Sequence, residues 1–163
     1  MKALVAYRTR YGTTATCARE LAGRLHAEAV CVDLGQDRPP DVRGFDVVLI
    51  GGSIYGGKIQ REVSWFCERN REALRQRPVG LFLCCLHQGA RAEAQLRDAF
   101  LQWLAAHAFA GRILGGELHY ERLRLFDRLL VRSLPHPAGD VSRLHAREID
   151  ALANAANGFL PGP

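Results

Sequence analysis

Lysine is nearly absent from this chain of 163 residues. Only Lys2 and Lys58 are lysines, so arginine supplies 20 of the 22 basic residues, and 22 basic against 17 acidic residues leave a formal net charge of +5. Guanidinium groups bind oxyanions through paired hydrogen bonds, so this composition favours anionic partners such as carboxylates, phosphates or an anionic membrane surface. It argues against an acidic electron carrier. A general arginine preference of the source genome is the alternative explanation.

Long apolar runs and paired cysteines are missing as well. No stretch approaches the roughly 20 apolar residues of a membrane-spanning helix, and no cleavable leader precedes the first apolar run, so we expect a cytoplasmic protein. The five cysteines are odd in number and none shows the C-x-x-C spacing, so we expect neither a disulfide framework nor a zinc site. Cys84 and Cys85 fall in an apolar run, where we expect buried small side chains rather than redox chemistry.

Short apolar runs alternate with amphipathic helical patterns along the chain. The runs are too short for helices and too apolar for exposed strands, which predicts strands covered on both faces. They span residues 3–7, 29–34, 46–50, 79–86 and 112–118. Helices are predicted over 14–27, 60–75 and 93–107, with a last helix that begins at Asp140 or Ser142 and ends before Gly158. The interval 35–44 contains two prolines, which predicts a loop or a single turn.

This alternation predicts a single α/β domain over residues 1–163. Five strands and intervening helices give a doubly wound, five-stranded parallel sheet. Such sheets bind ligands at the carboxyl ends of their strands. The loops after the first, third and fourth strands are therefore the candidate functional segments.

The loop after the first strand, residues 8–14, has the composition of a phosphate-binding turn. Thr9, Thr13 and Thr14 surround Gly12 just before a predicted helix. Backbone N–H groups at the helix start and the threonine hydroxyls can all donate to one anion. The G-x-G-x-x-G fingerprint of dinucleotide sites is missing. An ordinary threonine N-cap is the alternative.

The loop after the third strand, residues 51–58, places four glycines around Tyr55. Glycine lets the backbone approach a flat ligand, and the tyrosine offers a stacking face. Residues 52–58 match most of a P-loop, but Ile59 stands where a hydroxyl should bind Mg²⁺. An esterase nucleophile at Ser53 is equally poorly supported, because Tyr55 stands where the G-x-S-x-G motif of such enzymes has its second glycine. A flexible turn with a surface tyrosine is the remaining alternative.

After the fourth strand, residues 86–90 would close the third side of the same crevice. His87 lies in this loop, as a ligand contact or as an exposed loop histidine.

These loops resemble those of the flavodoxin-like fold, whose strand order is 2-1-3-4-5. The resemblance rests on Thr9-x-Tyr11-Gly12-x-Thr14 and on Gly51-Gly-Ser-Ile-Tyr55-Gly. Within that fold, residues 2–14 and 109–134 resemble the menaquinone-dependent protoporphyrinogen IX dehydrogenases, although the fourth-strand loop is shorter and has no basic insertion. The resemblance implies FMN, with its phosphate on the first loop and its ring between the other two. The residues implied are Thr9, Arg10, Tyr11, Gly12, Thr13, Thr14, Ser53, Ile54, Tyr55, Gly56, Gly57, Lys58, Leu86, His87, Gln88 and Gly89.

The same resemblance implies an FMN-dependent oxidoreductase of heme biosynthesis. A small-molecule substrate, a porphyrinogen, would give electrons through the flavin to a quinone, and we expect neither a metal nor a nucleic-acid partner. No side chain stands out as a catalytic acid or base. Two other functions stay open, namely a non-enzymatic electron-transfer flavodoxin and a flavodoxin-like binding module without flavin.

Residues 119–134 are predicted to form an amphipathic, arginine-rich insertion before the last helix. On a helix, leucines and a phenylalanine would line one stripe, and arginines four residues apart would line the opposite side. These are Leu123, Phe126, Leu130 and Leu134, and Arg124, Arg128 and Arg132. The pattern fits peripheral contact with the inner face of the cytoplasmic membrane. Packing on the protein's own sheet, or pairing of these arginines and Arg112 with tetrapyrrole propionates, are the alternatives.

Overall fold

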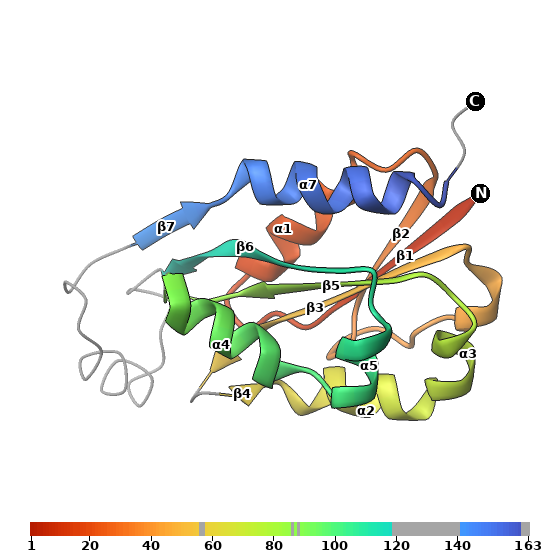
Figure 1. Ribbon diagram of the computed structural model, residues 1–163, viewed down its shortest axis with the longest axis horizontal. Helices are drawn as coiled ribbons and strands as arrows, with labels where there is room; N and C mark the ends of the chain where they lie inside the picture. The colour runs from red at the N-terminus through yellow and green to blue at the C-terminus, as the bar shows by residue number, and fades with distance from the viewer. Residues whose placement is uncertain (56–57, 86, 88, 119–140, 161–163) are drawn as a thin grey trace.

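A parallel β-sheet forms the centre of the molecule (Figure 1). The computed structural model describes residues 1–55, 58–85, 87, 89–118 and 141–160. The parallel strands are β1 (Lys2–Tyr7), β2 (Glu28–Asp33), β3 (Val47–Tyr55), β5 (Val79–Cys84) and β6 (Ala110–Leu118). They lie in the order β2-β1-β3-β5-β6, which confirms the predicted doubly wound sheet and its 2-1-3-4-5 order.

Two short antiparallel strands extend this sheet beyond the prediction. β4 (Lys58–Ile59) pairs with the end of β3, and β7 (Val141–Leu144) pairs with β6. The predicted start of the last helix at Asp140 or Ser142 is therefore wrong, because residues 141–144 are a strand and α7 spans Ala146–Asn157. The physical reason is the open edge of β6, whose backbone groups gain hydrogen-bond partners from β7.

Two predicted helices are each divided in two. The pattern over 60–75 becomes α2 (Arg61–Arg69) and α3 (Arg71–Arg75), and the pattern over 93–107 becomes α4 (Gly89–Ala99) and α5 (Gln102–His107). At the first division the Asn70 side chain donates to Phe66 O at 2.9 Å, which satisfies a carbonyl at the end of α2. The interval 35–44 contains no full helix, as predicted: a hydrogen-bonded turn follows β2, and the single helical turn is η1 (Val42–Gly44).

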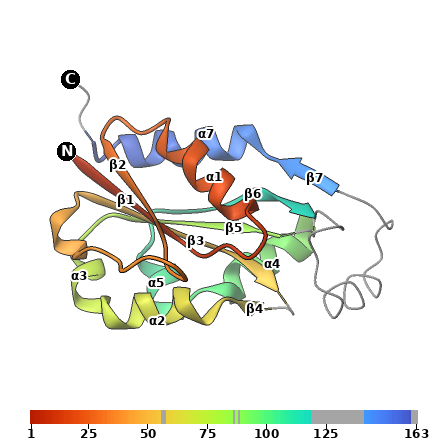
Figure 2. The same ribbon diagram turned by 180° about the vertical axis from the view of Figure 1, so that it is seen from behind.

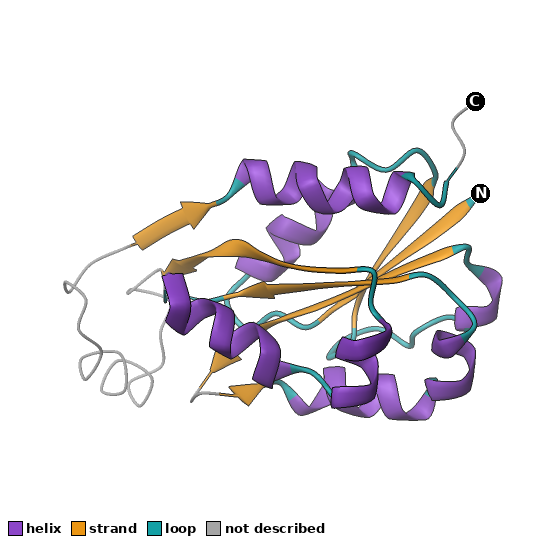
Figure 3. Cartoon of the chain, viewed as in Figure 1, coloured by secondary structure: helices purple, strands orange, loops and turns teal. Residues whose placement is uncertain are grey.

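Helices cover both faces of the sheet, as the apolar strands require (Figures 2 and 3). α1 (Thr13–Ala22) and α7 lie on one face and bury Leu21 and Leu152 completely. α2, α3, α4 and α5 lie on the other face, with Phe66 and Leu104 in its core. Cys84 and Cys85 are buried in the apolar interior, which confirms their predicted place in the core.

The carboxyl ends of the five parallel strands meet at one edge of the sheet, on the left in Figure 1. The three candidate loops leave the sheet at this edge. Among the described residues, no helix combines the length and the apolarity that a membrane span requires. The arginine-rich segment 119–134, with Arg124, Arg128 and Arg132, lies outside the described residues, so its membrane contact stays a prediction.

Candidate functional site

The loop between β1 and α1 turns sharply at Gly12. This glycine has φ 102°, a left-handed conformation that residues with side chains rarely adopt, and it is the N-cap residue of α1. Its N–H donates to Thr9 Oγ1 at 2.9 Å, and its carbonyl accepts from the N–H of Thr16 at 3.0 Å. No side chain caps the helix, so the ordinary threonine N-cap does not explain this loop. The positive end of the α1 dipole therefore faces this loop, where it favours an anion.

The Thr14 hydroxyl lies in the first turn of α1. Thr14 is 1% exposed, and its Oγ1 makes no hydrogen bond of ordinary geometry in the structure. The Cys84 thiol is close enough to interact with it, but a thiol is a weak hydrogen-bonding group. A buried hydroxyl without a partner is unfavourable by about 1–3 kcal/mol, and a phosphate oxygen at this helix start would supply the missing acceptor.

The Arg8 side chain, at the start of this loop, forms ion pairs with β2 and with α2. Its guanidinium lies 3.3 Å from Asp33 Oδ1 at the end of β2, and 3.5 Å from Glu62 Oε1 on α2. It also packs directly on the backbone of Gly35, where a Cβ atom would overlap the guanidinium. The Arg8 side chain is only partly exposed, so these contacts hold the loop and α2 at a fixed separation.

The loop after β3 is held at its base by Gln60. The Ser53 N–H donates to Gln60 Oε1 at 3.1 Å, and Gln60 Nε2 donates to Ser53 Oγ at 2.5 Å. Gly52 makes this approach feasible, because a Cβ there would come within 2.8 Å of Gln60 Oε1. The Tyr55 backbone pairs with Lys58 in the β3–β4 hairpin. The Tyr55 side chain, Gly56 and Gly57 lie outside the described part, so the predicted stacking stays a prediction.

The loop after β5 is described only at some positions. Leu86 and Gln88 lie outside the described residues. His87 is half-buried, and its carbonyl accepts from the Cys85 thiol at 3.7 Å. Gly89 has φ 58° and begins α4. A contact of this loop with a flavin ring stays a prediction.

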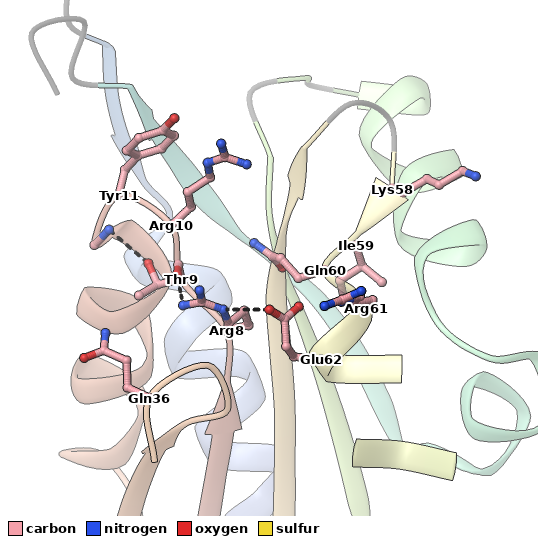
Figure 4. Close-up of a pocket in the computed structure, with 11 residues that line it drawn as sticks. Arg8, Thr9, Arg10, Tyr11, Gln36, Lys58, Ile59, Gln60, Arg61 and Glu62 are labelled. Atoms are coloured by element: carbon pink, nitrogen blue, oxygen red, sulfur yellow. Dashed lines mark hydrogen bonds and ion pairs between the residues drawn. The ribbon is translucent and has the colours of Figure 1, made fainter. Parts of the chain in front are cut away.

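A cavity of about 920 Å³ opens between the first loop and the start of α2 (Figure 4). It brings together the predicted site residues Thr9, Arg10, Tyr11, Gly12 and Lys58. Its other described lining residues, which were not among the predicted site residues, are Arg8, Gln36, Ile59, Gln60, Arg61 and Glu62. The cavity is lined mainly by charged and amide side chains and is large enough for a small organic ligand.

Of the missed residues, Arg8 had a readable signal and the others did not. Arg8 directly follows an apolar strand, at the edge where such sheets bind ligands. Gln60 is separated from Ser53 by seven positions, and their pairing depends on how the β3–β4 hairpin folds back.

Two buried thiols lie behind the first loop. Cys17 on α1 and Cys84 on β5 have their Sγ atoms 3.5 Å apart. The hydrogen bond to Cys17, and secondarily burial, raise the pKa of the Cys84 thiol well above its ordinary value. A thiol that stays protonated is a poor nucleophile. In the described ranges no three His, Cys, Asp or Glu side chains form a group that could hold a metal ion.

A sequence profile of the flavodoxin domain matches residues 4–144. The chain belongs to the flavodoxin-domain family. Flavodoxin domains bind FMN, and FMN is the cofactor of this flavodoxin-domain protein. No curated protein matches the sequence.

Solved structures agree in fold with this flavodoxin domain. A flavodoxin, WrbA-like protein from Agrobacterium tumefaciens has a TM-score of 0.62 at 14% identity, with 99% of both chains covered. Megasphaera elsdenii flavodoxin has a TM-score of 0.59 at 19% identity, over 96% of this chain and 98% of that one. Rubredoxin oxygen:oxidoreductase from Desulfovibrio gigas has a TM-score of 0.57 at 12% identity, over 99% of this chain but 37% of that one.

The first loop of this flavodoxin domain fits an FMN phosphate. The left-handed Gly12 forms the turn, this N-cap residue makes no side-chain cap hydrogen bond, and the buried Thr14 hydroxyl has only the weak contact with the Cys84 thiol among the described residues. All three features match what a doubly charged phosphate requires, namely several donors and the positive end of a helix. FMN supplies the electron-transfer chemistry when bound, and the chain supplies the cradle.

Proposed function

We propose that this flavodoxin domain is an FMN-dependent oxidoreductase that passes electrons from a reduced small molecule to a quinone. The observation that supports an enzyme over a carrier is charge. The chain has a net charge of +5, and of the five charged residues that the structure describes on the cavity beside the first loop, four are cationic. A positive cleft concentrates anionic small molecules.

The residues of the chain have separable tasks in this proposal. Thr14 Oγ1 and the N–H groups at the start of α1 hold the phosphate. Arg8 fixes the first loop against β2 and α2 through its two ion pairs. Gln60 fixes the start of the ring-binding loop through Ser53. Such fixed geometry lowers the cost of ordering the site when the cofactor binds.

The finer part of the proposal concerns the substrate. We infer a porphyrinogen, with a quinone as acceptor and a role in heme biosynthesis, from the resemblance of residues 2–14 and 109–134 to protoporphyrinogen dehydrogenases. Purified protein would be reconstituted with FMN and tested anaerobically for porphyrinogen oxidation, followed by porphyrin fluorescence, with menaquinone as the acceptor. Turnover that needs both FMN and quinone supports the proposal. No turnover, in protein that binds FMN fully, contradicts it.

A non-enzymatic electron carrier has equal support from the family match and from the flavodoxin structures. It differs in what it reacts with. A carrier exchanges electrons with a redox protein and turns over no small molecule, so reduction by a small donor in the absence of any protein partner separates the two functions. Colourless protein that cannot be reconstituted with FMN would instead indicate a binding module.

Peripheral membrane contact at the inner face of the cytoplasmic membrane is a further part of the proposal. It rests on the sequence pattern of Arg124, Arg128 and Arg132 opposite leucines. Each basic group near an anionic surface contributes about 1 kcal/mol, so replacing all three by glutamine should weaken vesicle binding by roughly a hundredfold. Co-sedimentation with anionic and neutral vesicles measures this. Equal, negligible binding of both proteins contradicts it.

A further inference from the structure

The two buried thiols behind the first loop are close to bonding distance. Cys17 on α1 is fully buried, Cys84 at the end of β5 is 3% exposed, and neither takes part in a disulfide. Their Sγ atoms are 3.5 Å apart, and a disulfide needs about 2.05 Å. The contact joins α1, whose start faces the cofactor, to a central strand of the sheet (Figure 2).

The hydrogen bonds of the thiol pair lead toward β6. The Cys84 thiol donates to Cys17 Sγ, and the Cys17 thiol donates to Leu114 O at 3.8 Å. The Leu114 carbonyl also accepts from the His145 N–H at 3.1 Å. Loss of both thiol hydrogens would therefore not leave this carbonyl without a partner, so the interior can accept a disulfide here.

Thr14 connects the thiol pair to the phosphate cradle. Thr14 and Cys17 are three residues apart on α1, so they lie on the same side of the helix. The Cys84 thiol is close to both side chains. Thr14 is 1% exposed, and protein interiors are close-packed, so neighbouring groups must move together. A bond between the two sulfur atoms would draw α1 toward β5 and shift the Thr14 hydroxyl with it.

We propose that Cys17 and Cys84 are an oxidation site that controls FMN binding: hydrogen peroxide converts the pair to a disulfide, which moves the Thr14 hydroxyl away from the FMN phosphate. Two S–H bonds and the peroxide O–O bond break, one S–S bond forms, and both oxygen atoms leave as water with the two thiol hydrogens. The thiols are oxidised, the peroxide is reduced, and a dithiol reductant reverses the change. The inference rests on the placement of the FMN phosphate at Thr14.

Burial determines how fast the pair reacts. The thiolate is the form that attacks a peroxide, and the hydrogen bond to Cys17, and secondarily burial, raise the pKa of the Cys84 thiol. Oxidation should therefore be slow at neutral pH and faster at alkaline pH, which suits a reversible modification and not rapid turnover. Because a phosphate held by Thr14 requires the reduced arrangement, bound FMN should oppose the oxidation.

Peroxide treatment of the full chain, without and with saturating FMN, tests this site. The peroxide is removed with catalase, free thiols are alkylated in denaturant, and mass spectrometry of proteolytic peptides identifies the disulfide. We expect a link between Cys17 and Cys84 that forms more slowly with FMN bound. The oxidised apoprotein should bind FMN about tenfold or more weakly, which corresponds to the loss of one charged hydrogen bond. Riboflavin, which has no phosphate, should bind both forms equally, and dithiothreitol should restore FMN affinity.

Cys17→Ala and Cys67→Ala are the matched variants, because each removes one buried thiol. Only Cys17→Ala should abolish both the link and the peroxide-dependent loss of FMN affinity. Three results would overturn the proposal: no link in protein whose half-buried Cys31 has been oxidised, a link that leaves FMN affinity unchanged, and a loss of FMN affinity that Cys17→Ala retains. No electron donor or quinone enters this assay, so these results do not bear on the oxidoreductase function, and absence of porphyrinogen turnover would leave the oxidation site standing.

Discussion

Replacing Thr14 by valine should stabilise the apoprotein and weaken FMN binding at the same time. Valine has nearly the shape of threonine, so the change removes only the hydroxyl. In the structure that hydroxyl is buried without a hydrogen bond of ordinary geometry, and the Cys84 thiol close to it is a weak hydrogen-bonding group. Burial of a hydroxyl that lacks a hydrogen bond is unfavourable by about 1–3 kcal/mol, so its removal should raise the free energy of unfolding of the apoprotein by that amount.

FMN binding, in contrast, should become weaker in the Thr14→Val variant. A hydrogen bond to a charged group contributes about 1.5–3 kcal/mol, so its loss should weaken FMN binding by about tenfold to about 150-fold. At an FMN concentration of about 100 times the wild-type Kd, the ligand stabilises wild type by about 2.7 kcal/mol, but a tenfold weaker variant by only about 1.4 kcal/mol. The stability advantage of the variant should therefore shrink as FMN is added.

Urea unfolding of both apoproteins, and fluorescence titration with FMN, measure the two quantities. Thr16→Val is the matched control, because the Thr16 hydroxyl already donates to Gly12 O at 3.2 Å. That variant should lose about 1 kcal/mol of apoprotein stability and keep FMN affinity within about threefold. Thr14→Val apoprotein that is less stable than wild type, or that binds FMN as well as Thr16→Val does, would refute the assignment of this hydroxyl to the phosphate.

Three further predictions concern the core, alkaline pH and the ring-binding loop. Gly51→Ala should cost about 1–3 kcal/mol or more, because its Cβ would overlap the buried Phe82 ring, and Phe82→Leu in the same chain should recover part of this loss in urea unfolding. Burial, and then the nearby negative charge of Glu68, raise the pKa of Cys67 to about 12, so the folded protein keeps a proton that the unfolded chain loses above about pH 9. Stability should fall between these two pH values by about 1.4 kcal/mol per pH unit, and Cys67→Ala should flatten this slope. Gln60→Ala should weaken FMN binding about tenfold by releasing its two hydrogen bonds to the loop after β3, whereas unchanged affinity in fluorescence titration would limit Gln60 to a structural role.

The strands and the position of the site could be predicted because both depend on local patterns. A run such as Val47–Ile50 is apolar at every position, and only a strand with helices on both faces buries all of them. Parallel strands then bring their carboxyl ends to one edge, so loops that are distant in the chain could be grouped from the sequence alone.

Features that depend on a distant partner could not be predicted. Residues 141–144 form β7 because the edge of β6 needs hydrogen-bond partners, and nothing in their own sequence specifies that edge. The contacts of Arg8 with Asp33 and Glu62 join three elements whose spacing only the folded chain defines. The cavity was missed for the same reason, since its two walls come from the first loop and from α2.

The pairing of β6 with β7 places the two ends of the segment 119–140 next to each other, which is the usual requirement for a site of loop insertion. Leu118 and Val141 are register partners on neighbouring strands, so the chain leaves the sheet and returns to it at one place. Exchange of everything between these two anchors would leave the backbone pairing of Leu118 with Val141, and of the residues before and after them, in place. Since loop-closure entropy changes slowly with length, the position should accept inserts of very different sizes. The fold thus offers, at the end of the sheet where the cofactor binds, a position between Leu118 and Val141 at which the sequence can change while β6 and β7 keep their pairing.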